Sequence, residues 1–194
     1  ARRQRQMCIR DRHTGHLSMS DRTKPKRDLE PSYLKAKHSA LRLLSYRSRS
    51  EKEVHRRLQG RFTEDAINHT ISDLREHGLL NDMSFAREWR EKRQRLKPRA
   101  SQVIRRELRE LGVDSEIIQE TLSDFDDSSN AHRAGYKYAT KLPLDDNAMF
   151  KRKLGGFLHR KGFHGEILSL TVERIWLELF DPLDSHIDGD SQYS

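Results

Sequence analysis

The sequence predicts an all-α protein in which three tandem three-helix repeats form an elongated, curved array. Hydrophobic residues make up 34% and charged residues 35% of the 194 residues, a balance that suits helices with a single buried face. The chain has five Pro, ten Gly and few runs of β-branched residues, which disfavours sheet-rich folds. A helix–turn–helix pattern also recurs at nearly constant separation, which indicates a repeat architecture.

The recurring pattern consists of apolar residues on both sides of a tight turn. Ala66, Ile117 and Ile167 hold the same place in the three copies, with separations of 51 and 50 residues. The apolar spacing lets both helices of each copy present a stripe to one small core. A generic helical bundle would share this spacing, but the repeated turn favours an array.

Capping residues mark the predicted ends of these helices. Ser50 and Glu53 form the S-x-x-E pattern of a capping box. Two further helix starts follow Thr63 and Asp114, where acidic residues also suit the helix dipole. Gly112 and Gly162 stand where a glycine commonly ends a helix. Asp82 is expected to cap the first helix of the second copy.

One more helix is expected before each pair, over about residues 33–46, 83–96 and 130–141, and prolines follow the second and third of these. We therefore expect repeats at residues 32–80, 81–125 and 126–180. Residues 19–31 are expected to be a flexible basic segment. The acidic, polar residues 181–194 are expected to be a disordered tail.

Residues 1–18 are expected to be a non-native leader. Residues 2–12, RRQRQMCIRDR, match one reading frame of a common transposase sequencing adaptor; a natural basic tail is the alternative. The segment holds five Arg, one Asp and the single cysteine, Cys8. Without it the net charge falls from +8 to +4, and no thiol remains for a disulfide, a metal site or a nucleophile.

Charge alternates in blocks along the chain. Residues 20–60 contain 12 basic and 5 acidic residues, residues 113–130 contain none and 6, and residues 131–161 contain 8 and 2. This pattern favours an elongated molecule with a basic stripe and separate acidic zones. No apolar stretch approaches the ~20 residues that span a bilayer, so no membrane partner is predicted.

Motifs of the common catalytic and nucleotide-binding sites are missing from the sequence. There is no G-x-x-x-x-G-K-[ST], G-x-S-x-G or H-E-x-x-H pattern. The acidic pairs Asp126–Asp127 and Asp145–Asp146 fall in predicted linkers, where solvated loop acids are expected. We therefore predict no catalytic residue, no cofactor and no metal. An enzyme on an α-helical scaffold is an alternative to this prediction.

Basic residues provide the positive signal. They cluster at similar places in the three copies, so stacking of the repeats would align them into a track for phosphates or for an acidic protein groove. Ordinary solvated helix faces are the alternative. The candidate contact residues are Arg47, Arg49, Arg56, Arg57, Arg90, Arg93, Arg95, Lys97, Arg99, Arg105, Arg106, Arg109, Lys151, Lys153, Arg160 and Lys161. Trp89, Trp176, Tyr136 and Tyr138 are interpreted as core residues and not as base-stacking platforms.

Several stretches resemble the RecX family of recombinase regulators. They are ALRLLSYRSRSEKEVHRRLQGRF from Ala40, AINHTISDLREHGLLNDMSFAREW from Ala66, RRELRELGV from Arg105 and FLHRKGF from Phe157. The resemblance runs from about residue 40 to residue 180 and is weaker in the third copy. It implies a bacterial, cytoplasmic protein of DNA repair, homologous recombination and the SOS response, and we expect a monomer. It also implies binding to the RecA–DNA filament and inhibition of strand exchange, ATP hydrolysis and co-protease function; assistance of the recombinase is the alternative to inhibition.

Three functions therefore remain to be separated. A regulator of the recombinase filament is expected to bind free single- or double-stranded DNA only weakly. A helical DNA-binding protein acting without a recombinase partner would bind DNA tightly, with a steep dependence on salt. An enzyme would need an activated nucleophile, a metal set or a phosphate loop, none of which the sequence offers.

Overall fold

The computed structural model describes residues 26–180, and the side chains of residues 31–180. Within that range all the named elements are α-helices, and the remaining pairing is one isolated bridge between Gln59 and Phe62. The prediction of an all-α fold with helical repeats is confirmed. The predicted leader, residues 1–18, and the predicted tail, residues 181–194, lie outside the described residues.

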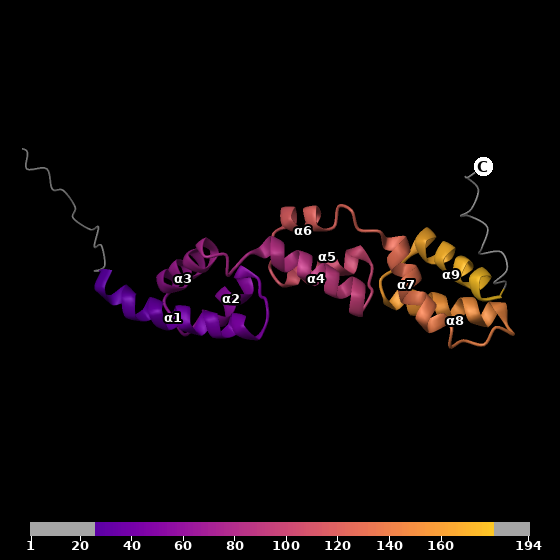
Figure 1. Ribbon diagram of the computed structural model, residues 1–194, viewed down its shortest axis with the longest axis horizontal. Helices are drawn as coiled ribbons and strands as arrows, with labels where there is room; N and C mark the ends of the chain where they lie inside the picture. Colours follow the sequence, from indigo (N-terminus) through magenta and orange to yellow (C-terminus); the bar gives the residue numbers. More distant parts are fainter. Residues whose placement is uncertain (1–25, 181–194) are drawn as a thin grey trace, which may run out of the picture.

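The nine helices of the described range follow one another along an elongated molecule (Figure 1). Each helix packs mainly against two others, which gives three groups. Unit 1 comprises α1 (Lys26–Tyr46), α2 (Glu51–Leu58) and α3 (Glu64–Glu76). Unit 2 comprises α4 (Asp82–Leu96), α5 (Ser101–Glu110) and α6 (Ser115–Thr121). Unit 3 comprises α7 (Asp127–Ala139), α8 (Asn147–Arg160) and α9 (Gly165–Phe180).

Helix α1 begins seven residues earlier than the pattern predicted, at Lys26 and not at residue 33. The prediction placed the start of this helix too late because its apolar pattern begins at Tyr33 and Leu34, after Pro31, which lies inside the helix. Pro31 is the sixth residue of the helix, and its ring nitrogen cannot donate to the backbone oxygen four residues earlier, so one hydrogen bond of the ladder is missing there. Residues 26–31, part of the segment expected to be flexible, are therefore helical.

Each unit has its own hydrophobic cluster. The second helices of the units contribute two fully buried residues each, in a register that repeats every fifty residues. The six residues are Val54 and Leu58, Ile104 and Leu108, and Leu154 and Leu158. Because the buried positions match, the surface positions of α2 and α5 that lie fifty residues apart match as well.

The helix starts follow the predicted caps in part. The Ser50 hydroxyl accepts the Glu53 N–H at 3.1 Å, and the Thr63 hydroxyl accepts the Ala66 N–H at 3.4 Å. The Glu53 carboxylate, however, bonds to two arginines instead of completing the capping box. The prediction that Asp82 caps α4 is wrong, because the Asn81 side chain accepts the Ser84 N–H at 2.9 Å and is the cap.

Asp82 instead makes a contact between units, and an equivalent contact recurs at the next boundary between units. Its carboxylate accepts the backbone N–H of Glu51, the first residue of α2, at 2.8 Å. In the same way the Asp127 carboxylate accepts the backbone N–H of Ser101, the first residue of α5, at 2.7 Å. Each bond joins the first turn of a unit's first helix to the first turn of the preceding unit's second helix. We call these two boundaries joint 1 and joint 2.

A glycine turn completes each joint. Gly112, between α5 and α6, has φ +87° and meets the Lys52 side chain of unit 1. Gly162, between α8 and α9, has φ +94° and meets Val103 of unit 2. Both glycines follow the end of their helix, as predicted, and both are needed because the neighbouring unit leaves no room for a Cβ atom. The joints therefore fix how the three units follow one another.

Candidate partner-binding surface

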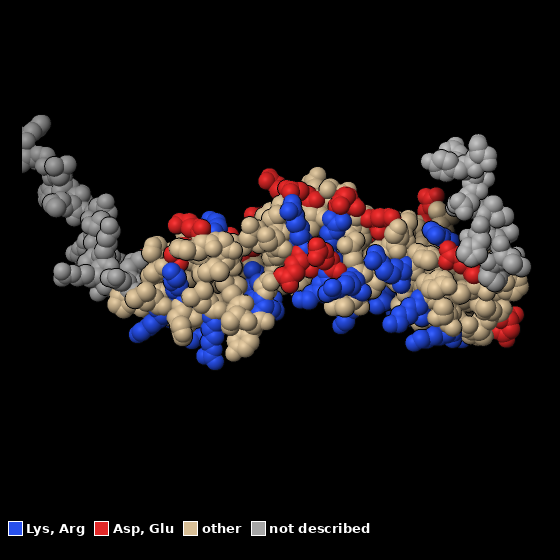
Figure 2. Space-filling view, viewed as in Figure 1, with Lys and Arg blue, Asp and Glu red and all other residues tan. Residues whose placement is uncertain are grey.

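Charge is distributed unevenly over the surface of the array. In Figure 2 many Lys and Arg side chains lie along the lower edge of the molecule from unit 1 to unit 3, and a group of Asp and Glu lies above them over α6, while further acidic side chains lie in the centre and at the lower right end. This arrangement agrees with the separation of basic and acidic zones expected from the sequence. The contacts of each predicted cation show whether its charge is already paired within the protein or is available to a partner.

The two arginines between α1 and α2 pair with the same buried carboxylate of unit 1, Arg49 from a buried position and Arg47 from the surface. Glu53 is 3% exposed and forms ion pairs with Arg47 and Arg49. Arg49 is itself 9% exposed and also donates from Nε to the backbone oxygen of Leu43 at 3.1 Å. Arg49 therefore ties the end of α1 to α2, and its charge is already neutralised.

A second carboxylate gathers cations inside unit 2. Glu107 accepts hydrogen bonds from Arg93 at 2.6 Å and from the Trp89 indole N–H at 2.9 Å. The guanidinium of Arg99 lies 3.8 Å from the same carboxylate, and that of Arg93 lies over the Trp89 ring. These contacts connect α4 to α5, so Arg93 and Arg99 are partly engaged in holding the unit together.

Arg90 is engaged in the same way on the other side of α4. Its guanidinium donates to the Thr121 backbone oxygen at 2.7 Å and pairs with Asp124 at 2.5 Å. The hydrogen bond from Arg90 holds the pKa of Asp124 below its usual range. Arg90 contacts α6 and Arg93 contacts α5, and each is paired with an acidic side chain, so neither presents a free charge.

The remaining predicted cations lie at the surface. Arg106 and Lys151 have partners, Glu110 at 3.9 Å and Glu173 at 2.5 Å. Eight others are exposed and have no ion pair with any residue that the structure describes. We call these eight the basic row: Arg56, Arg57, Arg95, Lys97, Arg105, Arg109, Lys153 and Arg160.

Three cations converge at joint 2. Burial lowers the pKa of Lys161 below its ordinary value, and the neighbouring charges of Arg99 and Lys97 lower it further. Lys161 belongs to the turn of unit 3, and the other two belong to the loop of unit 2. The joint thus concentrates positive charge from two units at one point, where an anion would relieve the repulsion.

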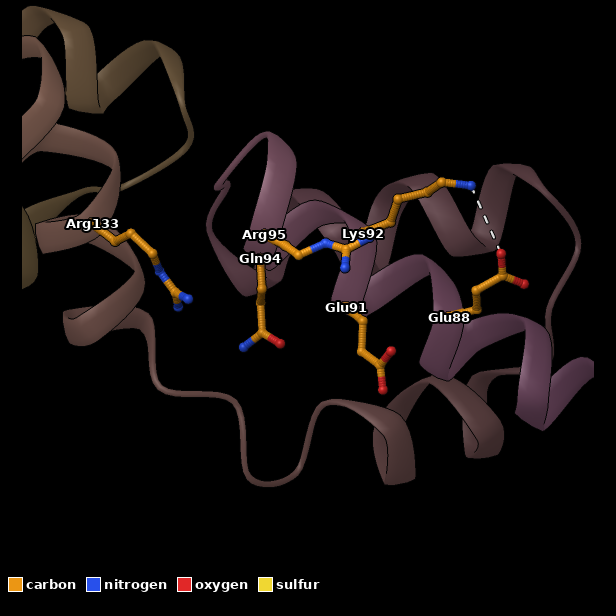
Figure 3. A pocket seen from close by; sticks show the side chains of 6 residues that line it. All are labelled: Glu88, Glu91, Lys92, Gln94, Arg95 and Arg133. Carbon is orange, nitrogen blue, oxygen red and sulfur yellow. Dashed lines mark ion pairs between the residues drawn. The ribbon is translucent and has the colours of Figure 1, made fainter.

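A polar cleft lies between α4 of unit 2 and α7 of unit 3 (Figure 3). Its lining residues are Glu88, Glu91, Lys92, Gln94, Arg95 and Arg133. Arg133 extends from α7 toward Gln94 and Arg95 on α4, and Lys92 pairs with Glu88 at 3.7 Å. The sequence prediction did not include Arg133, because α7 is polar and matches the repeat loosely. The signal in the sequence was that Arg133 is a cation in this helix ahead of Lys137.

The four aromatic residues interpreted as core have different surroundings. Trp176 is buried, Trp89 and Tyr138 are half-buried, and Tyr136 is 40% exposed.

Within residues 26–180 no group of three or more His, Cys, Asp or Glu could hold a metal ion. In the same range no helix has the length and apolar character needed to cross a membrane.

Comparison with known families gives two adjacent matches. Residues 36–74 match the model of the first three-helix domain of RecX, and residues 81–122 match the model of the second. The first match lies within unit 1 and the second coincides closely with unit 2.

Individual relatives extend the likeness into unit 3. The regulatory protein RecX of Chlorobium phaeobacteroides is 37% identical over 143 residues, which are 73% of this chain and 94% of the relative. That of Mycobacterium sp. (strain JLS) is 32% identical over 173 residues, which are 84% and 92% of the two chains. The crystal structure of RecX from Lactobacillus salivarius has the same fold, with a TM-score of 0.67 at 24% identity over 76% of this chain and 99% of that one.

Proposed function

The chain belongs to the RecX family of regulatory proteins, and on that premise we propose that it binds the RecA–DNA filament and inhibits recombinase, ATPase and co-protease activity. The family membership supports a regulatory role. The filament as partner, the inhibition and the residues that make contact are the further steps of the proposal.

The observation that carries this proposal is the basic row. Its members come from all three units, and the joints hold those units in a fixed succession. A filament repeats identical subunits along its length, so a ligand that presents unpaired cations on each of three successive units can contact more than one subunit at once. Phosphates or acidic side chains along the filament would be the matching groups.

The proposed activity needs binding alone. A long ligand that lies across several subunits opposes any rearrangement between them, because each rearrangement would break its contacts. We therefore infer that the protein acts without a catalytic residue or cofactor of its own, and that it works in the cytoplasm, where the filament forms.

Binding to assembled filaments, compared with binding to the same DNA without RecA, tests the proposal. We expect the protein to co-sediment with RecA–single-stranded DNA filaments at concentrations at which it leaves the bare strand unbound. Tight binding to the bare strand with a steep salt dependence, and no gain from RecA, would instead favour a DNA-binding protein that acts without a recombinase partner.

A further inference from the structure

The two end helices of the array carry exposed leucines with the same spacing. On α1, Leu34 is 56% and Leu41 is 38% exposed. On α9, Leu170 is 62% and Leu177 is 57% exposed. Residues seven apart lie on one face of a helix after two turns, so each pair forms a short apolar stripe.

Each stripe is flanked by charges at the same interval, and the charges are opposite in sign. On α1 the flanking residues are Lys35 and Arg42, both exposed, and residues 31–46 contain no Asp or Glu. On α9 they are Glu166 and Glu173, both exposed, although Glu173 also pairs with Lys151 of its own unit. The exposed Arg174, between the two leucines, is paired with Glu178 at 2.8 Å. Leucines with flanking charges at seven-residue intervals are the pattern by which two helices select each other.

The two stripes cannot meet within one molecule. Helix α1 packs in unit 1 and α9 packs in unit 3, at opposite ends of the elongated array (Figure 1). Their complementary character therefore matches two copies of the chain. We propose that the α1 stripe of one copy binds the α9 stripe of the next, so that copies associate end to end.

This contact joins two different surfaces and does not close on itself, so it extends into an open chain of copies. A single pair of short helices buries little area, and the association is correspondingly weak in solution. The inference goes beyond the proposed function, and it departs from the expectation of a monomer. On a filament it would place successive copies in line, so that one bound copy favours the binding of the next.

Sedimentation velocity of the full chain over a range of concentrations tests the inference, in reducing buffer because of Cys8. We expect the unaltered chain to form a series of species that continues beyond the dimer. The variants Leu41→Asp and Leu177→Asp should each remain monomeric. Their equimolar mixture should form dimers and nothing larger, because each variant keeps one intact stripe. Leu79→Asp, at a leucine that is 53% exposed outside both stripes, is the matched control and should associate like the unaltered chain.

Charge reversal provides a second measurement that a folding defect would not imitate. Lys35→Glu with Arg42→Glu should abolish association, and adding Glu166→Lys and Glu173→Lys to the same chain should restore it. A monomeric unaltered chain at every concentration would overturn the inference. So would a monomeric mixture of the two leucine variants, or association that depends on only one of the two stripes.

Discussion

The Asp82 carboxylate accepts the backbone N–H of Glu51 at 2.8 Å, and this bond ties the first turn of α4 to the first turn of α2. The first N–H groups of a helix have no partner within the helix, so α2 needs an acceptor from elsewhere. Unit 2 provides it. The same relationship between Asp127 and Ser101 at joint 2 indicates that the succession of units depends on a short, repeated set of polar contacts.

Asp82→Ala should therefore weaken joint 1. We expect the free energy of unfolding to fall by about 1–3 kcal/mol, because the partly buried Glu51 N–H loses its acceptor. Asp82→Asn keeps a side-chain oxygen and should remain within about 1 kcal/mol of the unaltered chain. Urea denaturation followed by circular dichroism measures both, and equal losses in the two variants would contradict the role given to the acceptor.

The pH dependence of the same group has a defined sign. Burial raises the pKa of Asp82 above its ordinary value. The folded state then takes up the proton before the unfolded state does, so this group's contribution to the free energy of unfolding decreases as the pH rises through the folded-state pKa. The Asp82→Asn variant should lack this contribution, which denaturation of both proteins in a pH series that rises from the ordinary Asp pKa of 3.8 would reveal.

Gly162→Ala should disrupt joint 2. The left-handed backbone at φ +94° costs an alanine about 1–2 kcal/mol, and the new Cβ atom would overlap the Val103 side chain. Gly60→Ala is the matched control, because Gly60 has φ +78° but open space around its Cβ direction. Thermal unfolding should show the larger loss for Gly162→Ala, and equal losses would contradict a tight fit at the joint.

Glu53→Ala should destabilise unit 1 strongly. It leaves the guanidinium of Arg49 buried without a counter-charge, which costs about 3–5 kcal/mol for a buried pair. Glu110→Ala removes the partner of an exposed pair with Arg106 and should cost less than about 1 kcal/mol. If urea denaturation gave similar midpoints for the two variants, the buried Arg49–Glu53 pair would not be a structural contact.

The fold class could be predicted from the sequence because the pattern of buried apolar residues determines it. Val54, Ile104 and Leu154 repeat at equal intervals, and apolar periodicity reports which helix faces are buried. The joints could not be predicted in this way. Asp82 has the sequence pattern of a cap, and its real partner lies 31 residues earlier in the chain, so only the packing of two units reveals it.

The candidate surface was predicted in composition but not in detail. Counting cations along α4 treats Arg90, Arg93 and Arg95 alike, whereas the structure pairs the first two with acidic groups outside α4 and leaves Arg95 exposed. Pairing between side chains distant in sequence has no local signal. The assignment of the basic row to a partner stays a prediction.

Lys161 offers a test through pH. If the three cations at joint 2 bind phosphate, affinity should fall as the pH rises through the lowered pKa of Lys161, because the lysine then loses its charge. The Lys161→Arg variant should keep its affinity over the same interval, since arginine stays protonated. Fluorescence anisotropy with labelled single-stranded DNA at low salt measures this, and identical pH profiles for the two proteins would exclude Lys161 from the contact.

The most direct test of the central claim is the RecA ATPase rate on single-stranded DNA, with this protein at substoichiometric and equal ratios. One variant reverses a row residue in each unit, Arg56→Glu, Arg105→Glu and Arg160→Glu. Its control reverses one exposed cation per unit outside the row, Arg61→Glu, Arg87→Glu and Arg174→Glu. We expect the unaltered chain and the control to inhibit the ATPase. The row variant should need an about tenfold higher concentration for the same inhibition. Inhibition that is absent in the unaltered chain, or lost equally in both variants, would contradict it.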